Sequence, residues 1–277
     1  MTRRPVLPPL VRVLLAACLL LPLAVGASGP AGAAGADPEA AARGAVRTLP
    51  PADLDWDYQL GGPAEPPARV GTVVRDRREA PAAGTYAICY VNGFQTQPDE
   101  RRFWRARWDL VLKKAGSPVV DSAWGEWLLD IRTAAKRERL ARIVAGWTAG
   151  CAADGYDAVE LDNLDSFTRS RGLLSAADAR AFARLLVSDA HAAGLAVAQK
   201  NWVELGARGP QLGFDFAIAE ECGRWRECQG YVDTYGPRVL MVEYRDADFA
   251  WTCGRFGDHP VVRRDLALSA GGVRAWC

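Results

Sequence analysis

The sequence predicts an α/β protein that folds as a single (β/α)8 barrel of the TIM type. Short apolar segments recur along the chain, helical patterns lie between several of them, and polar residues follow most of the apolar segments. Alternating strands and helices are typical of parallel α/β folds, and eight strands in one domain of this length fit a barrel. A doubly wound sheet is the alternative. The chain has no GxGxxG motif after a strand and no P-loop, which argues against a nucleotide-binding fold.

The N-terminal segment is expected to be removed from the mature protein. A basic start is followed by the apolar run Val13–Val25 and by small residues that fit a cleavage site at Val25-Gly26-Ala27. We therefore predict a secretory signal peptide at residues 1–27, because the run is short for a membrane span. A flexible leader rich in Ala, Gly and Pro follows at residues 28–50, and the barrel domain occupies residues 51–277.

This organisation predicts a secreted, extracellular protein with no stable membrane association after cleavage. Lipoprotein anchoring through Cys18 is a minor alternative, because Leu15-Ala16-Ala17-Cys18 looks like a lipoprotein processing site. Processing there would leave the apolar residues Leu19–Val25 outside the signal, so this alternative ranks second.

The charge balance excludes one class of partner. The chain carries 34 Lys and Arg against 33 Asp and Glu, and the predicted cleavage leaves a slight excess of acids. Because no basic patch stands out, nucleic acid is not an expected partner.

The cysteines that remain after cleavage are expected to form disulfides, because their number is even and the chain is exported. Zinc is a poor alternative, since there is no CxxC motif and the chain has only two His. Cys222 and Cys228 are close enough in sequence to pair, and Cys253 with Cys277 is a plausible clasp for the C-terminus. Six cysteines allow fifteen pairings, so the pairing stays open.

Eight segments are predicted as strands and three as helices. The predicted strands are Trp56–Leu60, Tyr86–Val91, Val119–Ser122, Ala158–Leu161, Ala196–Gln199, Phe214–Ala219, Val239–Val242 and Val261–Val262. The predicted helices are Phe103–Ala115, Ala135–Asp154 and Ala176–Ala193. In the second helix, apolar residues at positions 140, 143, 144 and 147 have the spacing of one buried face.

The stretch Gly155–Phe167, with the sequence GYDAVELDNLDSF, carries the strongest functional signal. It is a buried strand that ends in a cluster of acids, and in parallel α/β folds the C-terminal ends of strands form the active site. A barrel would gather the polar ends of the other strands in the same bowl. The candidates are Gln59, Tyr90, Asn92, Glu126, Glu160, Asp162, Asn163, Asp165, Lys200, Asn201, Glu220, Glu243 and Tyr244.

Carboxylates, amides and aromatic rings together suit a sugar substrate, although several of these residues have structural alternatives. Asp165 could cap the helix that follows it. Glu160 could be a hydrogen-bonding residue of the barrel interior, and Lys200 could pair structurally with one of the acids. Glu220 and Glu221 alternate across a strand, so one of them is expected to point outward.

The sequence resembles glycoside hydrolase family 114, the endo-α-1,4-polygalactosaminidases. The matching motifs run in order through most of the chain. They are WDYQL at 56–60, AICYVNGF at 87–94, GEWLLDIR at 125–132, GYDAVELDNLDSF at 155–167, AHAAGLAVAQKN at 190–201, FDFAIAEECGRWREC at 214–228 and Val242-Glu243-Tyr244. Departures such as Tyr90-Val91-Asn92, Ala158 and Ala219-Glu220 bear on substrate details more than on the reaction class.

The resemblance implies a secreted (β/α)8 glycosidase that cleaves α-1,4-linked galactosamine-containing polysaccharide. It assigns Asp162 as nucleophile and Glu220 as acid/base, places the other candidates in substrate binding, supports the Cys222–Cys228 pair, and implies no organic cofactor or metal. Retention of the anomeric configuration is favoured over inversion only weakly, and the oligomeric state stays open.

Two other functions remain open. One is a sugar-binding barrel without turnover, against which the intact acids Asp162 and Glu220 argue. The other is a metal-dependent hydrolase that uses Glu160, Asp162 and Asp165 on a divalent ion.

Overall fold

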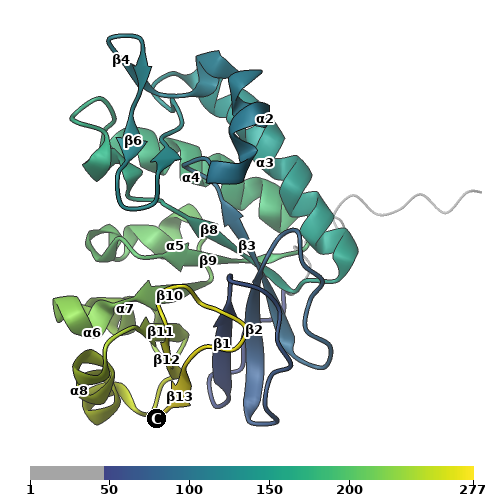
Figure 1. Ribbon diagram of the computed structural model, residues 1–277, viewed down its shortest axis with the longest axis vertical. Helices are drawn as coiled ribbons and strands as arrows, with labels where there is room; N and C mark the ends of the chain where they lie inside the picture. Colours follow the sequence, from purple (N-terminus) through teal and green to yellow (C-terminus); the bar gives the residue numbers. More distant parts are fainter. Residues whose placement is uncertain (1–46) are drawn as a thin grey trace, which may run out of the picture. The chain divides into compact units, whose positions relative to one another are not determined.

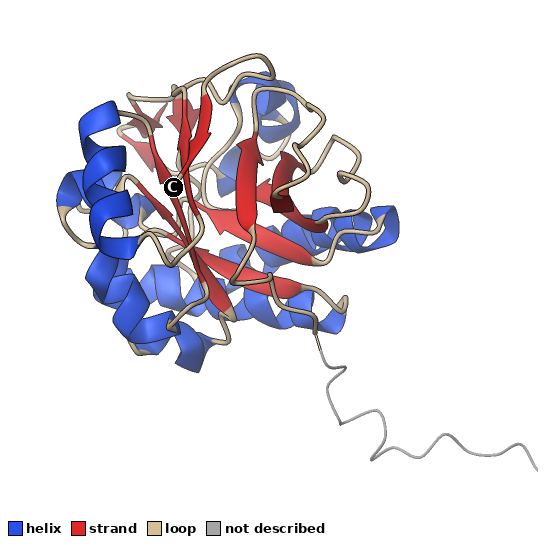
Figure 2. Cartoon of the chain, turned by 90° about the horizontal axis from the view of Figure 1, so that it is seen from below, coloured by secondary structure: helices blue, strands red, loops and turns tan. Residues whose placement is uncertain are grey.

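Eight parallel strands form the central sheet, and helices cover its outer face (Figures 1 and 2). The computed structural model describes residues 47–277. The parallel strands, in spatial order, are β1 (Asp55–Gln59), β2 (Val70–Asp76), β3 (Tyr86–Asn92), β8 (Ala158–Asp162), β9 (Ala196–Lys200), β10 (Phe216–Glu220), β11 (Val239–Glu243) and β12 (Val261–Arg264). The strand β13 (Arg274–Trp276) pairs with β12 in the antiparallel sense. The prediction of a (β/α)8 barrel is confirmed.

The longer helices lie in the crossovers between successive parallel strands. They are α3 (Ala134–Asp154), α4 (Ala176–Ala192), α5 (Arg208–Leu212), α6 (Cys222–Trp225), α7 (Cys228–Tyr235) and α8 (Asp246–Phe256). The side chain of Thr133 caps α3, and Gly155 ends that helix with a φ of 92°, a conformation that glycine adopts without strain. Ser175 and Asp178 form a capping box at the start of α4. The two long helices therefore match their predicted ranges.

Two predicted elements are wrong, and both precede α3. The segment Val119–Ser122 is not a barrel strand, since β6 (Val120–Asp121) pairs in an antiparallel hairpin with β7 (Glu126–Trp127). The predicted helix Phe103–Ala115 ends early, because α2 spans only Arg101–Arg105.

The physical reason is a run of consecutive buried residues. Leu110, Val111 and Leu112 are all buried, which one face of a surface helix cannot provide. Their backbone pairs instead with the later segment, through the bonds from the Leu112 N–H to the Leu128 carbonyl and from the Asp130 N–H to the Leu110 carbonyl. Short elements complete this region: η1 (Pro98–Glu100), η2 (Trp108–Leu110), β4 (Lys113–Lys114) and β5 (Ser117–Pro118). Further along the chain lie η3 (Ser166–Arg169) and η4 (Val203–Leu205).

The barrel has two apolar layers because each strand is buried on both faces. Trp56, Ile88, Ala158, Phe216 and Leu240 belong to the cluster inside the barrel. Strand neighbours such as Cys89, Val159, Ala217 and Met241 belong to the cluster between the sheet and the helices. Side chains alternate between these layers along every strand, so the parity of a residue decides whether it can face the bowl.

The residues just before the barrel are packed against it. The Tyr86 hydroxyl donates to the Thr48 carbonyl over 2.9 Å, and Leu49 packs on the inner cluster. The last residues of the predicted leader at 28–50 are thus held in place. The predicted signal peptide at 1–27, Cys18 and the leader up to residue 46 lie outside the described residues.

Three disulfides are present in the described part of the chain. Cys222 bonds Cys228 and Cys253 bonds Cys277, which are the two pairs that the spacing suggested. The third joins Cys89 on β3 to Cys151 on α3, a pair left open by the sequence. Within residues 47–277, no helix combines the length and the apolar character needed to cross a bilayer.

A buried ion pair fastens the seam between β1 and β12. Arg264 and Asp57 are both fully buried, and the Arg264 Nη1 lies 2.5 Å from the Asp57 Oδ1. The same guanidinium donates to the carbonyls of Tyr58, Ser269 and Val273. In the described residues, β1 and β12 share no ladder of backbone hydrogen bonds. The Arg264 side chain therefore provides part of the connection between these two strands.

We expect Arg264→Leu to lower the free energy of unfolding by about 3–5 kcal/mol, because the Asp57 carboxylate stays buried without its ion pair to Arg264. Chemical denaturation measures the loss. The matched control is Arg263→Leu, since Arg263 pairs with an Asp246 side chain that is 86% exposed, and exposed pairs contribute at most about 1 kcal/mol. Equal losses in the two variants would contradict the role of Arg264 at the seam.

Candidate active site

Three charged side chains meet at the C-terminal ends of β8, β9 and β10. Asp162, Lys200 and Glu220 are the last residues of these strands. Each follows inward-facing residues at two-residue intervals, for example Phe216 and Ile218 before Glu220. All three side chains therefore face the same bowl.

The Lys200 ammonium is the centre of this group. Its Nζ lies 3.3 Å from the Asp162 Oδ1 and 3.4 Å from the Glu220 Oε2. Below them it lies 2.9 Å from the Glu160 Oε1 and donates to the Tyr58 hydroxyl over 2.8 Å. The side chain of Lys200 is 2% exposed, so the ammonium depends on these partners for its solvation.

The two carboxyls of β8 have opposite pKa shifts. Burial raises the pKa of Glu160 to about 7, although Lys200 opposes this effect. Burial also acts to raise the pKa of Asp162, but the Lys200 ammonium and the Tyr90 hydroxyl outweigh it and hold that pKa below its usual value. Asp162 is therefore ionised at neutral pH, while Glu160 is poised near neutrality.

Three tyrosine hydroxyls orient the carboxylates. Tyr90 donates to the Asp162 Oδ2 over 2.7 Å, and Tyr58 donates to the Glu160 Oε1 over 2.7 Å. The Tyr244 hydroxyl donates to Glu220. Each carboxyl is thus held by one tyrosine and by Lys200, and the geometry is fixed before any substrate arrives.

The central pocket lies over these groups and has a volume of about 370 Å³. Its remaining lining includes Trp124 and Glu126 from the β6–β7 hairpin and Leu266 from the loop before β13. A second cavity of about 640 Å³, here called the side groove, shares Asp165, Asn201 and Glu220 with the central pocket. The two cavities therefore form one continuous depression that passes over Glu220.

The backbone leaves each of the three site strands in a left-handed conformation. Asn163 follows Asp162 with a φ of 64°, Asn201 follows Lys200 with a φ of 48°, and Glu221 follows Glu220 with a φ of 56°. Non-glycine residues adopt this region at a cost, and such strain concentrates at functional sites. The sharp turns aim the last side chain of each strand into the bowl.

Some predicted site residues do not reach the pocket. Gln59 and Glu243 have the wrong parity, since Tyr58 and Val242 are the inward-facing residues of their strands. Gln59 is fully buried and bonds Asp57 and Arg75, and Glu243 accepts from the Gly223 N–H and the Thr252 hydroxyl. The structure therefore places neither of these two residues in the lining of the pocket.

Two other predicted residues, Glu160 and Asn92, lie beneath the pocket and do not line it. Glu160 lies one interior layer below Asp162 and is fully buried. Asn92 is also buried, where it accepts from the Gln95 N–H and donates to Glu126 over 2.9 Å. Tyr90, Glu126, Asn163, Asp165, Lys200, Asn201 and Tyr244 do line the pocket, with Asp162 and Glu220.

Sequence reasoning missed several lining residues. Tyr58 is the inward neighbour of the predicted Gln59, in a strand whose two buried faces the apolar pattern does not distinguish. Arg169 forms ion pairs with Asp121 at 2.7 Å and with Asp165 at 3.0 Å, and no motif pointed to it. Leu266 comes from a loop whose position the sequence does not reveal.

A divalent metal between Glu160, Asp162 and Asp165 conflicts with this arrangement. Lys200 already provides the cation between the first two carboxyls, and Asp165 is engaged by Arg169. The cluster of potential ligands in the described residues is Cys222, Cys228 and Glu243, but its two sulfurs are joined in a disulfide.

Residues 36–277 match glycoside-hydrolase family GH114. The chain belongs to this family. The predicted enzyme class, a glycoside hydrolase, is confirmed with it. A comparison with curated proteins gives no match.

Solved structures of similar fold include the following two. Aspergillus fumigatus Ega3 in complex with galactosamine is 19% identical with a TM-score of 0.66, and the match covers 84% of this chain and 100% of that one. The glycoside hydrolase domain of PelA from Pseudomonas aeruginosa is 17% identical with a TM-score of 0.54, covering 80% and 99%. At these identities the likeness concerns the fold.

The raised pKa of the Glu126 carboxyl can be tested by measuring how the stability of the protein depends on pH. Burial raises its pKa to about 7, although the hydrogen bond from Asn92 opposes the shift. A carboxyl whose pKa is higher in the folded protein than in the unfolded chain costs stability as pH rises from the unfolded pKa to the folded one.

We therefore expect Glu126→Gln to gain stability over the wild type as pH rises from about 4.5 to about 7, reaching up to about 3 kcal/mol. Urea denaturation across this pH range measures the difference. Glu138→Gln is the control, because it makes the same change at an exposed position on α3. A stability difference for Glu126→Gln that does not change with pH would show that the pKa of this carboxyl is not raised.

Proposed function

We propose that the protein is a secreted hydrolase of α-1,4-linked galactosamine-containing polysaccharide, with Asp162 as nucleophile and Glu220 as acid/base. The observation that carries the proposal is the pair of carboxylates held by one ammonium at the floor of a continuous depression. Family membership supports glycosidic bond cleavage, and the galactosamine bound to the similar Ega3 supports the sugar.

The roles follow from the surroundings of each carboxyl. Lys200 and Tyr90 stabilise the charged form of Asp162, as attack on an anomeric carbon requires. Glu220 has a side chain 24% exposed and lies where both cavities meet, so it can reach the oxygen of the bond to be cleaved and later a water.

In the first step Glu220 gives its proton to the leaving oxygen while Asp162 bonds to the sugar. In the second step Glu220 takes a proton from the water that releases the sugar.

The spacing favours retention of configuration. The Asp162 Oδ1 and the Glu220 Oε2 lie 3.3 and 3.4 Å from the same nitrogen, so they can be no farther apart than the sum of these distances. Inverting glycosidases separate their carboxyls by about 6.5–9.5 Å and retaining ones by about 5–5.5 Å. The bound between these two oxygens includes the retaining spacing, and this is what favours retention. NMR of the first product would show the α-anomer.

Asp162→Asn and Glu220→Gln should each reduce hydrolysis about a thousandfold or more, because each removes a group from the reaction while keeping its shape. Reducing-end release from de-N-acetylated polymer measures the rate, and circular dichroism checks the fold. Asp258→Asn and Glu138→Gln make the same changes at exposed positions and should keep full activity. Near-normal turnover in either site variant would remove that residue from the mechanism.

The pocket should prefer a sugar with a free amine. Arg169 neutralises Asp121 and Asp165, but Glu126 has no Lys or Arg within ion-pair distance among residues 47–277. Its charge, present above its pKa of about 7, can attract an ammonium group.

We expect cleavage at pH 8 to be faster on de-N-acetylated than on fully N-acetylated polymer, and this preference should weaken with added salt. Glu126→Gln should reduce the preference more than Glu138→Gln does. Equal rates on both polymers with no effect of salt would show that the carboxylates serve structure and bond cleavage only.

A further inference from the structure

The side groove differs from the central pocket in how it is built. It is lined by Trp225 and Glu227 from the α6–α7 connection and by Glu204 from η4. None of these side chains contributes to the group around Lys200. Because the groove shares Glu220 and Asn201 with the central pocket, a linear polymer cleaved at Glu220 can continue along it.

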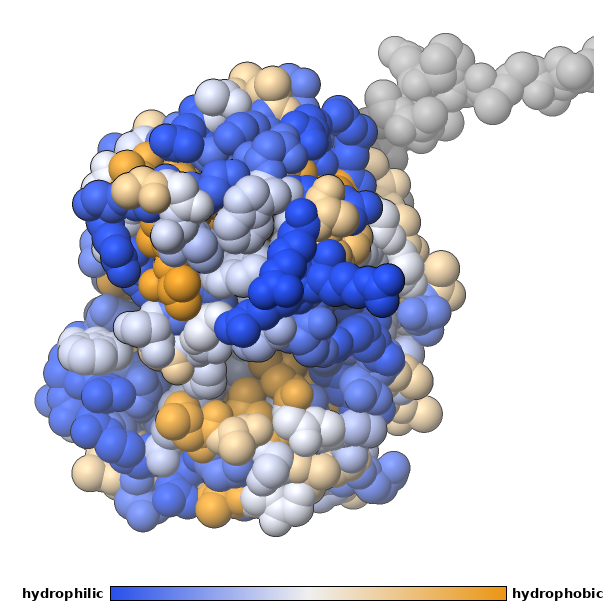
Figure 3. All heavy atoms as spheres, turned by 45° about the horizontal axis from the view of Figure 1, so that its top comes forward, coloured by the Kyte–Doolittle hydropathy of each residue, from blue (hydrophilic) through white to orange (hydrophobic). Residues whose placement is uncertain are grey.

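Trp225 is unusual among the tryptophans of the described residues. It is 62% exposed, and only Trp124 at 56% is comparable. Each of the two lines one cavity, Trp124 the central pocket and Trp225 the side groove. An exposed indole in a polar depression offers a flat apolar face of the kind that packs on the apolar face of a sugar ring. The face of the molecule drawn in Figure 3 carries hydrophilic residues with apolar patches between them.

The Trp225 ring is held in place from one side. The Arg224 guanidinium carbon lies 4.8 Å from the ring centre, and the Arg224 Nη1 donates to both oxygens of Glu221 over 2.9 Å. Stacking of this kind restrains an aromatic side chain. The opposite face of the indole is the one that a sugar would use.

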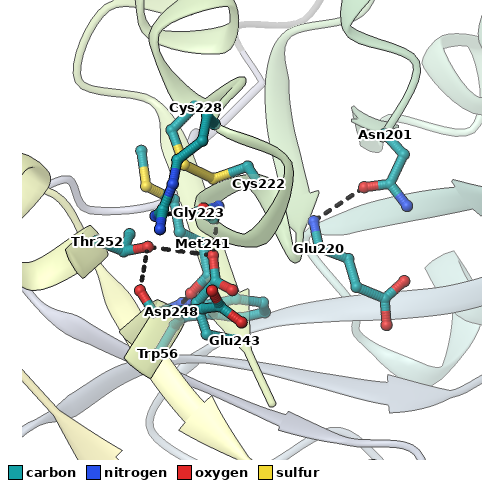
Figure 4. Close-up of a disulfide and its surroundings, with 11 residues drawn as sticks. Trp56, Asn201, Glu220, Cys222, Gly223, Cys228, Met241, Glu243, Asp248 and Thr252 are labelled. Carbon is teal, nitrogen blue, oxygen red and sulfur yellow. Dashed lines mark hydrogen bonds between the residues drawn. A yellow bond between two sulfur atoms is a disulfide. The ribbon is translucent and has the colours of Figure 1, made fainter. Parts of the chain in front are cut away.

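The loop that carries Trp225 is fixed below by buried contacts. The disulfide Cys222–Cys228 closes it, and the buried Glu243 accepts from the Gly223 N–H over 2.6 Å (Figure 4). A Cβ at Gly223 would overlap the Thr252 hydroxyl, so the loop lies directly against α8. This explains what Glu243 does in place of the substrate contact predicted from sequence.

Two acids, Glu204 and Glu227, line the groove together with Arg180 and Arg208. Neither Glu204 nor Glu227 forms an ion pair with another residue of the described chain. Burial raises the pKa of Glu227, and the neighbouring Glu204 carboxylate raises it further. An ammonium group placed between them would relieve this repulsion.

We propose that the side groove is a distal substrate-binding arm, in which Trp225 stacks on one sugar ring of the polymer and Glu204 and Glu227 accept the free amine of an amino sugar. This proposal rests on the proposed function for the identity of the polymer. It adds binding residues that act on long chains and do not touch the bond being cleaved.

The test measures binding of galactosamine oligosaccharides of different lengths by calorimetry on the Asp162→Asn protein. Trp225→Ala should weaken binding of long oligosaccharides roughly tenfold, equivalent to about 1.4 kcal/mol, and leave binding of the monosaccharide unchanged. Trp225→Tyr keeps an aromatic face and should restore most of the affinity. Glu227→Gln should weaken binding of de-N-acetylated but not of N-acetylated long oligosaccharides, while Glu138→Gln should change neither.

The outcomes separate this inference from the proposed function. If the wild type hydrolyses the polymer but Trp225→Ala binds long oligosaccharides as tightly as the parent, the distal arm is wrong and the proposed function stands. A loss of monosaccharide binding equal to the loss for long chains also overturns the arm. A wild type that binds long oligosaccharides through Trp225 without cleaving them would overturn the proposed hydrolysis and keep the arm. A wild type that neither binds nor cleaves them overturns both.

Discussion

The active end of the barrel is organised around a single buried ammonium. Lys200 faces the carboxyls of Glu160, Asp162 and Glu220, and one positive charge cannot neutralise three negative ones. Burial raises the pKa of Glu160 to about 7, so Glu160 takes up a proton more easily than the other carboxyl of β8. Asp162 stays charged because Lys200 and Tyr90 stabilise its anion, so the same lysine that makes the cluster possible also differentiates its acids.

This arrangement depends on strand register. Glu160 pairs across the sheet with Ala198 and lies one inward position below Asp162, while Lys200 lies opposite Ile218 on β10. The small side chains of Ala158, Ala196 and Ala198 leave room in the barrel interior for the long side chain of Lys200 to reach across. A shift of one residue in any of these strands would turn its charged side chain into the apolar layer beneath the helices.

The sequence reveals the chemistry of the strand ends better than it reveals which residues touch the pocket. The acids after Val159 and the lysine after Gln199 stand out because charge interrupts an apolar strand. In a strand buried on both faces, however, the apolar pattern does not indicate which parity faces the barrel interior. Gln59 and Glu243 were misplaced for this reason, and Tyr58 was overlooked although it is the neighbour of Gln59.

The barrel itself was predicted from the repeated alternation of strands and helices, yet one of its strands was missed. No helix lies between β1 and β2 or between β2 and β3, so the alternation of strands and helices gives no signal for β2. The segment counted in its place, Val119–Ser122, belongs to an insertion whose buried residues pair with one another locally. Short hairpin pairings of this kind leave no periodic trace in the sequence.

The site combines strained backbone turns at the strand ends with contacts that hold these turns in place. Asn163, Asn201 and Glu221 hold a left-handed backbone at the three strand ends, and the strain is offset by contacts such as that of the Glu220 N–H with the Asn201 side-chain oxygen over 2.9 Å. The strand ends are thereby rigid, whereas Trp124, Trp225 and Leu266 reach the depression from connecting segments. Strand ends hold the carboxylates and the lysine of the site, and the connecting segments decide what lies beside them. The reaction class is therefore readable from the strands, whereas the length and charge of the preferred polymer depend on the loops.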